Sequence, residues 1–369
     1  MQKNRKSEHS RKKILIITNH SYMLWRFRKE LIFELMKKYV VVLSMPFTGH
    51  EEDFQKSGIR CVETAIDRRG INPATDLKLL FVYYRLLKEE KPDLVITYSI
   101  KPNIYAGWLC GKMGIPFSAN VQGLGTAFQK PALAGFVTML YRLAFRKVQT
   151  VFFENSANME EFQKRHIMPV EKQVLLAGAG VDLEQYTLQP YPVHDKVHFL
   201  YLGRIMKEKG MDELFEAVRR LSGQKEGFVL DLVGFFEDEY REQVEQLEKD
   251  GIAVFYGFQQ DPVPFYKEAD CVILPSYHEG MSNVLLEGAA VGRPLITSDI
   301  PGCREAVEDG KNGFLVKAGD SESLLQAMQK FLCISQEKRR DMGMAGHEKM
   351  IREFGKKMVV ETTIQNLRV

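Results

Sequence analysis

The sequence is poor in the features that mark disulfide-bonded or metal-binding proteins. It has 5 cysteines in 369 residues, scattered without metal-ligand spacing. They are Cys61, Cys110, Cys271, Cys303 and Cys333. This pattern favours reduced thiols and gives no reason to expect a bound metal. His194 and His198 lie at the approach to a predicted strand rather than on a helix, so we interpret them as structural.

Long apolar runs and a strong charge imbalance are also missing. No segment approaches the roughly 18 apolar residues of a membrane span. The run ILIIT at 14–18 falls short of the roughly seven apolar residues that a secretory signal needs, so we expect a cytoplasmic protein. The formal net charge of +3 is too small to indicate a nucleic-acid-binding protein. The lysines and arginines in residues 1–12 predict a solvated basic tail.

What the sequence does contain is an alternation of short apolar runs with longer amphipathic ones, which is typical of parallel sheets covered by helices. The predicted strands are 13–19, 39–45, 93–99, 115–121 and 150–155, then 197–204, 228–234, 253–257, 271–276 and 293–299. The predicted helices include 27–38, 76–90 and 211–221. We predict an α/β protein with two Rossmann-like, doubly wound parallel-sheet domains, whose strand ends face a shared cleft.

The stretch 186–196 carries two prolines and no periodicity, which predicts a linker between the domains. The predicted domains are 1–187, including the basic tail, and 188–350, followed by a terminal helix in 351–369. Neither domain has Gly-x-Gly-x-x-Gly after its first strand, which disfavours a nicotinamide or flavin enzyme.

Two cations lie in the loop that follows the predicted strand 197–204. Arg204 and Lys209 precede a predicted helix. A forked guanidinium, a compact ammonium and a helix N-terminus together suit a diphosphate. Surface pairing of these cations with Glu208 and Asp212 is equally consistent with the loop taken alone.

Two glutamates flank the predicted start of a later helix, in the stretch HEGMSNVLLE. Ser282 is a suitable N-cap, which places Glu279 on the preceding loop and Glu287 one turn inside the helix. Such carboxylates can accept hydrogen bonds from sugar hydroxyls, while the backbone N–H groups of Gly280, Met281 and Ser282 meet an anion between them. A nucleoside diphosphate sugar fits this pattern, with its ribose on Glu287 and its sugar on Glu279.

Two other interpretations of the glutamates exist. Both side chains could be solvated surface residues, although the small and apolar LLEGAAVGRP is a poor setting for an unpaired carboxylate. They could also form the carboxylate pair of a glycosidase. That function would leave Arg204 and Lys209 without a role.

Three motifs resemble glycosyltransferase family 4, the retaining nucleotide-sugar transferases of the GT-B fold. They are GRIMKEKG at 203–210, PSYHEGMSNVLLEGAAVGRPLITSDIPGCREAVEDGKNGFLV at 275–316 and GAGVDLEQY at 178–186. The resemblance covers most of 14–369. It implies that Glu279 and Glu287 are the family's Glu-x7-Glu pair. It also implies same-face attack without a metal or other cofactor.

The residues and the resemblance together predict which residues contact the donor, and the resemblance implies that Arg204 and Lys209 steady the departing diphosphate. The predicted donor-binding residues are Gly203, Arg204, Lys209, Gly257, Glu279, Gly280, Met281, Ser282, Asn283 and Glu287, of which Glu279, Arg204 and Lys209 are also predicted to be catalytic. The final helix is expected to cross back onto the first domain, as it does in similar folds.

Residues 97–128 resemble the branch of the family that builds capsules, exopolysaccharides and lipid-linked glycans. This resemblance implies an acceptor sugar carried on polyprenyl diphosphate. The acceptor or sugar-side candidates are Asn19, His20, Arg26, Lys101, Gln122 and Gly123. Many members have a histidine where this chain has Gln122, and glutamine cannot relay a proton at neutral pH. The leaving phosphate is therefore the more plausible base. His20 is equally consistent with an ordinary capping residue.

The segment 129–148 predicts a basic amphipathic helix. Its apolar stripe comprises Phe136, Leu140, Leu143 and Ala144, and its charges are Lys130, Arg142, Arg146 and Lys147. Such a helix can lie on an anionic membrane surface, and a helix that packs against the core has a similar pattern. The implied lipid-linked acceptor favours the membrane, so we expect a peripheral protein at the inner face of the plasma membrane.

The residues and the resemblance together predict a glycosyltransferase that moves a hexose or hexosamine from a UDP-sugar, ahead of a GDP-sugar, and the resemblance implies that the transfer is retaining. A non-catalytic sugar-nucleotide-binding subunit of a polysaccharide complex and a nucleotide-sugar epimerase of similar fold are the alternatives.

Overall fold

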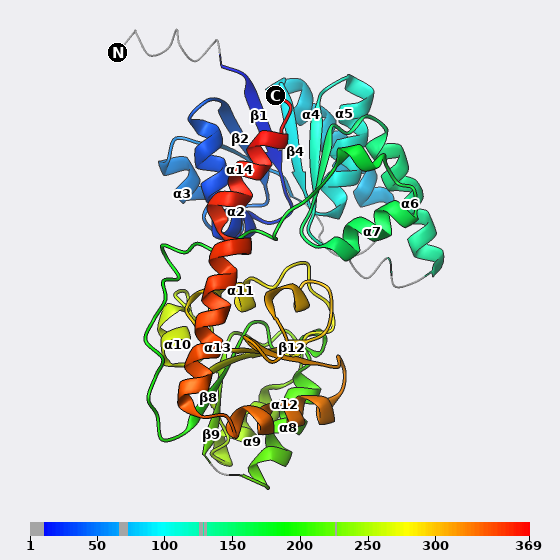
Figure 1. The fold of residues 1–369 in the computed structure, drawn as a ribbon. Coiled ribbons are helices and arrows are strands. Elements are labelled where there is room, and N and C mark those ends of the chain that lie inside the picture. The colour runs from blue at the N-terminus through cyan, green and yellow to red at the C-terminus, as the bar shows by residue number, and fades with distance from the viewer. Residues whose placement is uncertain (1–10, 66–72, 125–127, 129–130, 226) are drawn as a thin grey trace. The chain divides into compact units, whose positions relative to one another are not determined.

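The chain forms two compact units in the computed structural model, which describes residues 11–65, 73–124, 128, 131–225 and 227–369 (Figure 1). The first unit comprises the chain up to Ala179 together with Val359–Val369. The second unit is Gly180–Met358. Each unit is an α/β domain built around a parallel sheet, as the alternating pattern predicts.

The first unit contains a seven-stranded sheet in the order β3-β2-β1-β4-β5-β6-β7. Its strands are β1 (Lys13–Ile17), β2 (Val40–Met45), β3 (Arg60–Glu63), β4 (Leu94–Tyr98), β5 (Phe117–Val121), β6 (Thr150–Phe153) and β7 (Gln173–Leu175). All pairs are parallel, and the strand order reverses between β1 and β4.

Helices cover both faces of this sheet (Figure 1). They are α2 (Ser21–Met36), α3 (Glu51–Lys56), α4 (Pro73–Glu90), the π-helical turn η1 (Pro102–Ala106), α5 (Gly107–Met113), α6 (Pro131–Ala144), the 3-10 turn η3 (Phe145–Lys147) and α7 (Ser156–Lys164). Because side chains alternate along a strand, Ile14 and Ile16 pack with α2 and α3, whereas Leu15 and Ile17 pack with α4, α5 and α6.

The second unit contains a six-stranded sheet in the order β10-β9-β8-β11-β12-β13. Its strands are β8 (Val197–Leu202), β9 (Phe228–Val233), β10 (Ala253–Phe255), β11 (Cys271–Leu274), β12 (Leu295–Ser298) and β13 (Gly313–Val316). Its helices are α8 (Met211–Ser222), α9 (Arg241–Lys249), α10 (Val263–Glu268), α11 (Asn283–Ala290), α12 (Ser321–Leu332), α13 (Gln336–Lys349) and the π-helical turn η7 (Met350–Phe354). Here the strand order reverses between β8 and β11.

The predicted strands are all present, but three observed strands were not expected. β3 and β7 are short edge strands whose residues are mostly half-buried or exposed, so they lack the continuous apolar run of a central parallel strand. β13 is the corresponding edge strand of the second sheet.

The boundary between the units differs from the predicted one. The first unit ends at Ala179 rather than at residue 187. Residues from Gly180 onward join the second unit because Val181 donates its backbone N–H to the Phe354 carbonyl at 2.8 Å and accepts from the Lys356 N–H at 2.9 Å. The predicted linker is held further along the chain, where Arg293 is fully buried and donates to the carbonyl of Pro190 at 2.8 Å. Gln189 also donates its backbone N–H to Val291 at 3.1 Å. The segment predicted as a linker is thus bonded to the second unit.

The chain ends in the first unit. α14 (Lys356–Asn366) begins in the second unit, and its residues from Val359 onward belong to the first. Val360 packs in the core beside α2, and Val359 packs against Phe152 and Leu176. The return to the first unit therefore starts at Val359 rather than at residue 351.

Candidate functional site

Two predicted site residues meet where the strand order of the second sheet reverses. Lys209 follows β8 and Glu279 follows β11, and these neighbouring strands are parallel. The Lys209 ammonium lies 2.5 Å from Glu279 Oε1, and both side chains are mostly buried. Ser276 donates its hydroxyl to the same carboxylate oxygen at 2.8 Å. Ligands of doubly wound sheets bind at this kind of switch point, outside the carboxyl ends of the strands.

Arg204 lies in the same loop but has a different partner. Its guanidinium pairs with Glu237, which follows β9, at 2.5 Å. The alternative in which Arg204 and Lys209 pair with Glu208 and Asp212 is wrong, because both cations reach carboxylates on neighbouring loops instead. The Arg204 side chain is 44% exposed and therefore open to an anion from solvent.

The second glutamate is buried inside its helix. Ser282 is the N-cap of α11, and its hydroxyl accepts from Leu285 N, which confirms the predicted cap. Glu287 lies one turn inside α11, as predicted, and accepts from the Tyr266 hydroxyl of α10 at 3.0 Å. An ion pair thus brings Lys209 and Glu279 together, whereas Arg204 pairs with Glu237 and Glu287 accepts from Tyr266.

One predicted anion donor is used within the protein. The Ser282 backbone N–H donates to the carbonyl of Gly302 at 2.8 Å, so this predicted anion donor is already hydrogen-bonded within the protein. A side chain at Gly302 would clash with the turn, since its Cβ would lie 2.6 Å from the Gly280 carbonyl oxygen. The loop after β12 thus holds the Glu279–Ser282 turn in place.

Burial keeps two reactive groups near Glu279 neutral. It raises the pKa of Tyr201 well above its ordinary value, and the charge of Glu279 raises it further. Tyr201 therefore stays a donor, and its hydroxyl bonds the carbonyl of Arg204 at 2.5 Å. Burial likewise raises the pKa of the Cys303 thiol, with Glu279 adding to the effect, so Cys303 is unsuited to act as a nucleophile.

The remaining predicted donor-binding residues also lie at the carboxyl ends of the strands. Gly203 follows β8, and Gly257 follows β10 and accepts from Gly234 N at 2.9 Å. Met281 is buried in the turn before α11, and Asn283 is the first residue of that helix.

The acceptor candidates gather at the carboxyl edge of the first sheet. Asn19 follows β1 and accepts from the Ser99 hydroxyl at 2.6 Å, across the point where the strand order reverses. Lys101 follows β4 and pairs with Asp76 in the first turn of α4 at 2.9 Å. Gln122 follows β5 and is hydrogen-bonded to Glu154, which follows β6.

The other acceptor candidates are His20, Arg26 and Gly123, which follow β1 and β5 along the chain. His20 takes the N-cap position of α2, but its side chain makes no capping bond there. Arg26 is half-buried on α2, and Gly123 is half-buried beside Gln122.

Several residues of these sites were not predicted from the sequence. A buried ion pair joins Arg28 of α2 to Glu154, which is also hydrogen-bonded to Gln122. Burial raises the pKa of Glu154, and the Arg28 charge opposes that shift. Ser276 and Glu237 each follow a strand at the site edge, and this position is the signal that could have identified them.

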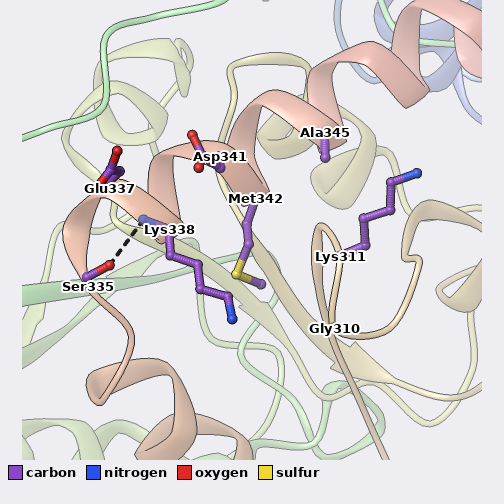
Figure 2. A pocket seen from close by; sticks show the side chains of 8 residues that line it. All are labelled: Gly310, Lys311, Ser335, Glu337, Lys338, Asp341, Met342 and Ala345. Atoms are coloured by element: carbon purple, nitrogen blue, oxygen red, sulfur yellow. Dashed lines mark hydrogen bonds between the residues drawn. The ribbon is translucent and has the colours of Figure 1, made fainter.

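A separate hollow of about 490 Å³ lies on the second unit, between the first turns of α13 and the turn that precedes β13 (Figure 2). Lys338 and Lys311 line it together with Glu337 and Asp341, so its charges are mixed. It lies at the amino end of β13, away from the carboxyl ends that carry the predicted site residues.

The comparisons with known proteins agree with this architecture. A family model described as "Glycosyl transferases group 1" matches residues 189–349, and one described as "Glycosyl transferase 4-like" matches residues 13–155. Two parallel α/β units with these matches define a glycosyltransferase of the GT-B fold. The chain belongs to glycosyltransferase family 4.

Individual relatives are more distant. The N,N'-diacetylbacillosaminyl-diphospho-undecaprenol alpha-1,3-N-acetylgalactosaminyltransferase of Campylobacter jejuni is 26% identical, over 86% of this chain and 88% of that protein. The UDP-Gal:alpha-D-GlcNAc-diphosphoundecaprenol alpha-1,3-galactosyltransferase of Escherichia coli is 25% identical, over 80% of this chain and 81% of that protein.

A solved structure shows the same fold. The crystal structure of HepE from Anabaena in complex with UDP has a TM-score of 0.76 and 17% identity, covering 96% of this chain and 98% of that one.

Proposed function

We propose that this glycosyltransferase is retaining and metal-independent, and that it moves a hexose or an N-acetylhexosamine from a UDP-sugar to a glycan on polyprenyl diphosphate. The product would be part of a capsule, an exopolysaccharide or another surface glycan. The enzyme would act as a peripheral protein at the inner face of the plasma membrane. The observation that carries the proposal is the Lys209–Glu279 pair at the switch point of the second sheet.

The names of the relatives support both substrates. The Campylobacter jejuni enzyme transfers N-acetylgalactosamine to an undecaprenol-linked sugar, and the name of the Escherichia coli enzyme gives UDP-Gal as the donor. We assign the donor to the second unit and the lipid-linked acceptor to the first.

The side chains of the second unit suit the departure of UDP. Negative charge builds on the diphosphate as its bond to the sugar carbon breaks, and Lys209 with Arg204 would neutralise it without a metal ion. A diphosphate would compete with Glu279 for the Lys209 ammonium. The released carboxylate would then accept from a sugar hydroxyl, while the buried Glu287 accepts from the ribose.

The first unit would supply the attacking hydroxyl. Its oxygen forms the new bond on the face from which the diphosphate leaves, which retains the anomeric configuration. Its proton passes to the leaving phosphate, since Gln122 cannot relay a proton at neutral pH. Gln122 would hydrogen-bond the acceptor sugar, and Glu154 holds its amide.

Replacing Glu279 with Gln tests the proposal. The substitution removes the carboxylate that pairs with Lys209, and we expect kcat to fall by about 100-fold or more. UDP release would be measured in EDTA, with and without a polyprenyl-diphosphate sugar. Glu208→Gln is the matched control, because Glu208 is an exposed carboxylate of the same loop as Lys209. Near-normal turnover by Glu279→Gln would remove its assignment, and dependence on added metal would exclude metal-independent transfer.

The same assay separates the alternatives. Release of UDP only when acceptor is present supports transfer. Tight donor binding without turnover would indicate a non-catalytic subunit. Interconversion of the nucleotide sugar without acceptor would indicate an epimerase.

A further inference from the structure

An exposed apolar face covers the outer side of three helices in the first unit. On α4 the exposed apolar side chains are Leu77, Phe81 and Tyr84, which are 69%, 60% and 36% exposed. On α5 the exposed apolar residue is Trp108, and on α6 they are Phe136, Met139 and Leu143. We call these seven residues the α4–α6 face. Exposed apolar side chains that gather on neighbouring helices, rather than singly, are typical of an interaction surface.

The three helices form one layer. α4, α5 and α6 all pack their inner sides into the same core cluster, on one side of the sheet, and α5 contacts both of its neighbours. The stripe on α4 follows helical spacing from Leu77 through Phe81 to Tyr84, which places these side chains along one side of the helix. The exposed apolar residues of α6 differ from the predicted stripe. Ala144 is buried and Leu140 packs against the core, whereas Met139, which was not predicted, is exposed.

The charge around this face is strongly positive. The exposed charged residues described on α4, α5, α6 and η3 are Lys78, Arg85, Lys88, Lys112, Arg142, Arg146, Lys147 and Glu89. Within these helices, Glu89 is thus the single exposed carboxylate beside seven cations. The other acids there are buried, with Asp76 paired to Lys101 and Glu90 to Lys13. Lys130, which was predicted to contribute, lies outside the described residues.

The face combines aromatic rings with nearby ammonium groups. Lys88 lies over the ring of Tyr84, 5.0 Å from its centroid, and Lys112 lies over Trp108 at 5.7 Å. Tryptophan and tyrosine are enriched at membrane–water interfaces, where an apolar ring enters the lipid and cations meet anionic head groups.

We propose that the α4–α6 face docks on an anionic lipid bilayer, with α4 and Trp108 as its main inserting elements rather than α6 alone. This inference rests on the proposed lipid-linked acceptor. It also places the membrane beside the carboxyl edge of the first sheet, where the acceptor candidates lie. Leu77 directly follows Asp76, and the Asp76 carboxylate accepts from the acceptor candidate Lys101 at 2.9 Å. A diphosphate emerging from the bilayer surface would meet Lys101 at the end of the apolar stripe. In the described part of the chain no helix is long and apolar enough to cross a bilayer.

The chain provides its own reporter for this contact. It has 2 tryptophans, Trp25 and Trp108. In a full-length Trp25→Phe variant, all tryptophan emission comes from Trp108. With vesicles of phosphatidylethanolamine and phosphatidylglycerol we expect a blue shift of this emission and quenching by brominated lipids, and little change with phosphatidylcholine alone.

Substitutions then locate the contact. Leu77→Ser with Phe81→Ser should lower vesicle partitioning about tenfold or more. The matched control is Val170→Ser with Leu175→Ser, since these residues are comparably exposed in the first unit but lie outside the face, and it should leave partitioning unchanged. Lys88→Gln with Lys112→Gln should remove the preference for anionic vesicles. UDP binding without vesicles, measured on each variant, should be unchanged.

Three results would overturn the inference. Co-sedimentation without a change in Trp108 emission would place the membrane contact elsewhere. Equal loss of partitioning in the control pair would mean that general surface apolarity is responsible. A stable dimer that Leu77→Ser with Phe81→Ser dissociates would show that a second copy covers the face. Failure of the proposed function is distinguishable, because it would appear as absent UDP binding or transfer, whatever the vesicle results.

Discussion

At the scale of single residues, the charged side chains of the second unit are held by partners from distant parts of the sequence. Lys209 and Glu279 are 70 positions apart, and Arg204 and Glu237 are 33 apart. A partly buried ion pair of this kind is costly to break on one side, because the remaining charge loses its partner. Residue types at strand ends could be predicted from the sequence, but the partners could not, since these depend on how the loops fold over one another.

His198 offers a test of such a pair through pH. Its Nδ1 lies 2.7 Å from Asp231 Oδ2, and this hydrogen bond raises the pKa of His198, while burial opposes the shift. The folded pKa lies above the unfolded value, so the stabilisation is full below about pH 6.5 and is lost as pH rises through the folded pKa. His198→Asn should therefore lower the free energy of unfolding more near pH 5.5 than near pH 9. We expect a difference of at most about 1 kcal/mol because the imidazole is partly solvated. Urea unfolding at both pH values measures it, and equal losses would contradict the assignment.

At the scale of elements, the site depends on loops that pack closely against one another. The loop after β8 touches the loop after β11 at Gly210, which has a φ of +75°. A Cβ at this position would lie 2.1 Å from the Pro275 carbonyl oxygen. The glycine thus allows Lys209 to approach the loop that carries Glu279.

Gly210→Ala should disturb both stability and the site. The left-handed φ and the clash together should cost about 2 kcal/mol or more of unfolding free energy. Gly251→Ala is the matched control, because Gly251 has a φ of +70° but nothing within 4 Å of an added Cβ. Its cost should stay near 1 kcal/mol, which is the conformational part alone. Chemical unfolding compares them, and equal costs would mean that the loop contact at Pro275 is not tight.

The central elements could be predicted from the sequence because buried parallel strands are continuous apolar runs. The runs at β1, β4, β8 and β11 are examples, and each observed strand lies within its predicted range. β3 and β7 escaped prediction because edge strands are half-exposed and lack this signal. The α6 stripe was partly wrong because helical spacing alone does not say which side faces the core.

At the scale of the whole molecule, the family and the fold followed from motifs, but the division of the chain did not. A linker was predicted where the sequence has prolines, yet the buried Arg293 binds that segment to the second unit. The first unit also depends on the end of the chain, because Thr150 donates its hydroxyl to the Asn366 carbonyl at 2.9 Å. Such long-range contacts have no local sequence signal.

The central claim is that the loops at the β8–β11 switch point bind the diphosphate of the donor. The most direct measurement is the affinity of the intact chain for UDP, by calorimetry, in Lys209→Met and in Lys207→Met. Both substitutions remove one lysine from the same loop. Lys207 is exposed, and its ammonium makes a loose contact with Asp212 at 3.7 Å, whereas Lys209 is mostly buried and pairs with Glu279. We predict that Lys209→Met weakens UDP binding about tenfold or more, as loss of a charge-assisted contact should, and that Lys207→Met leaves it nearly unchanged. Equal affinities in a folded Lys209→Met variant and the wild type would contradict the claim.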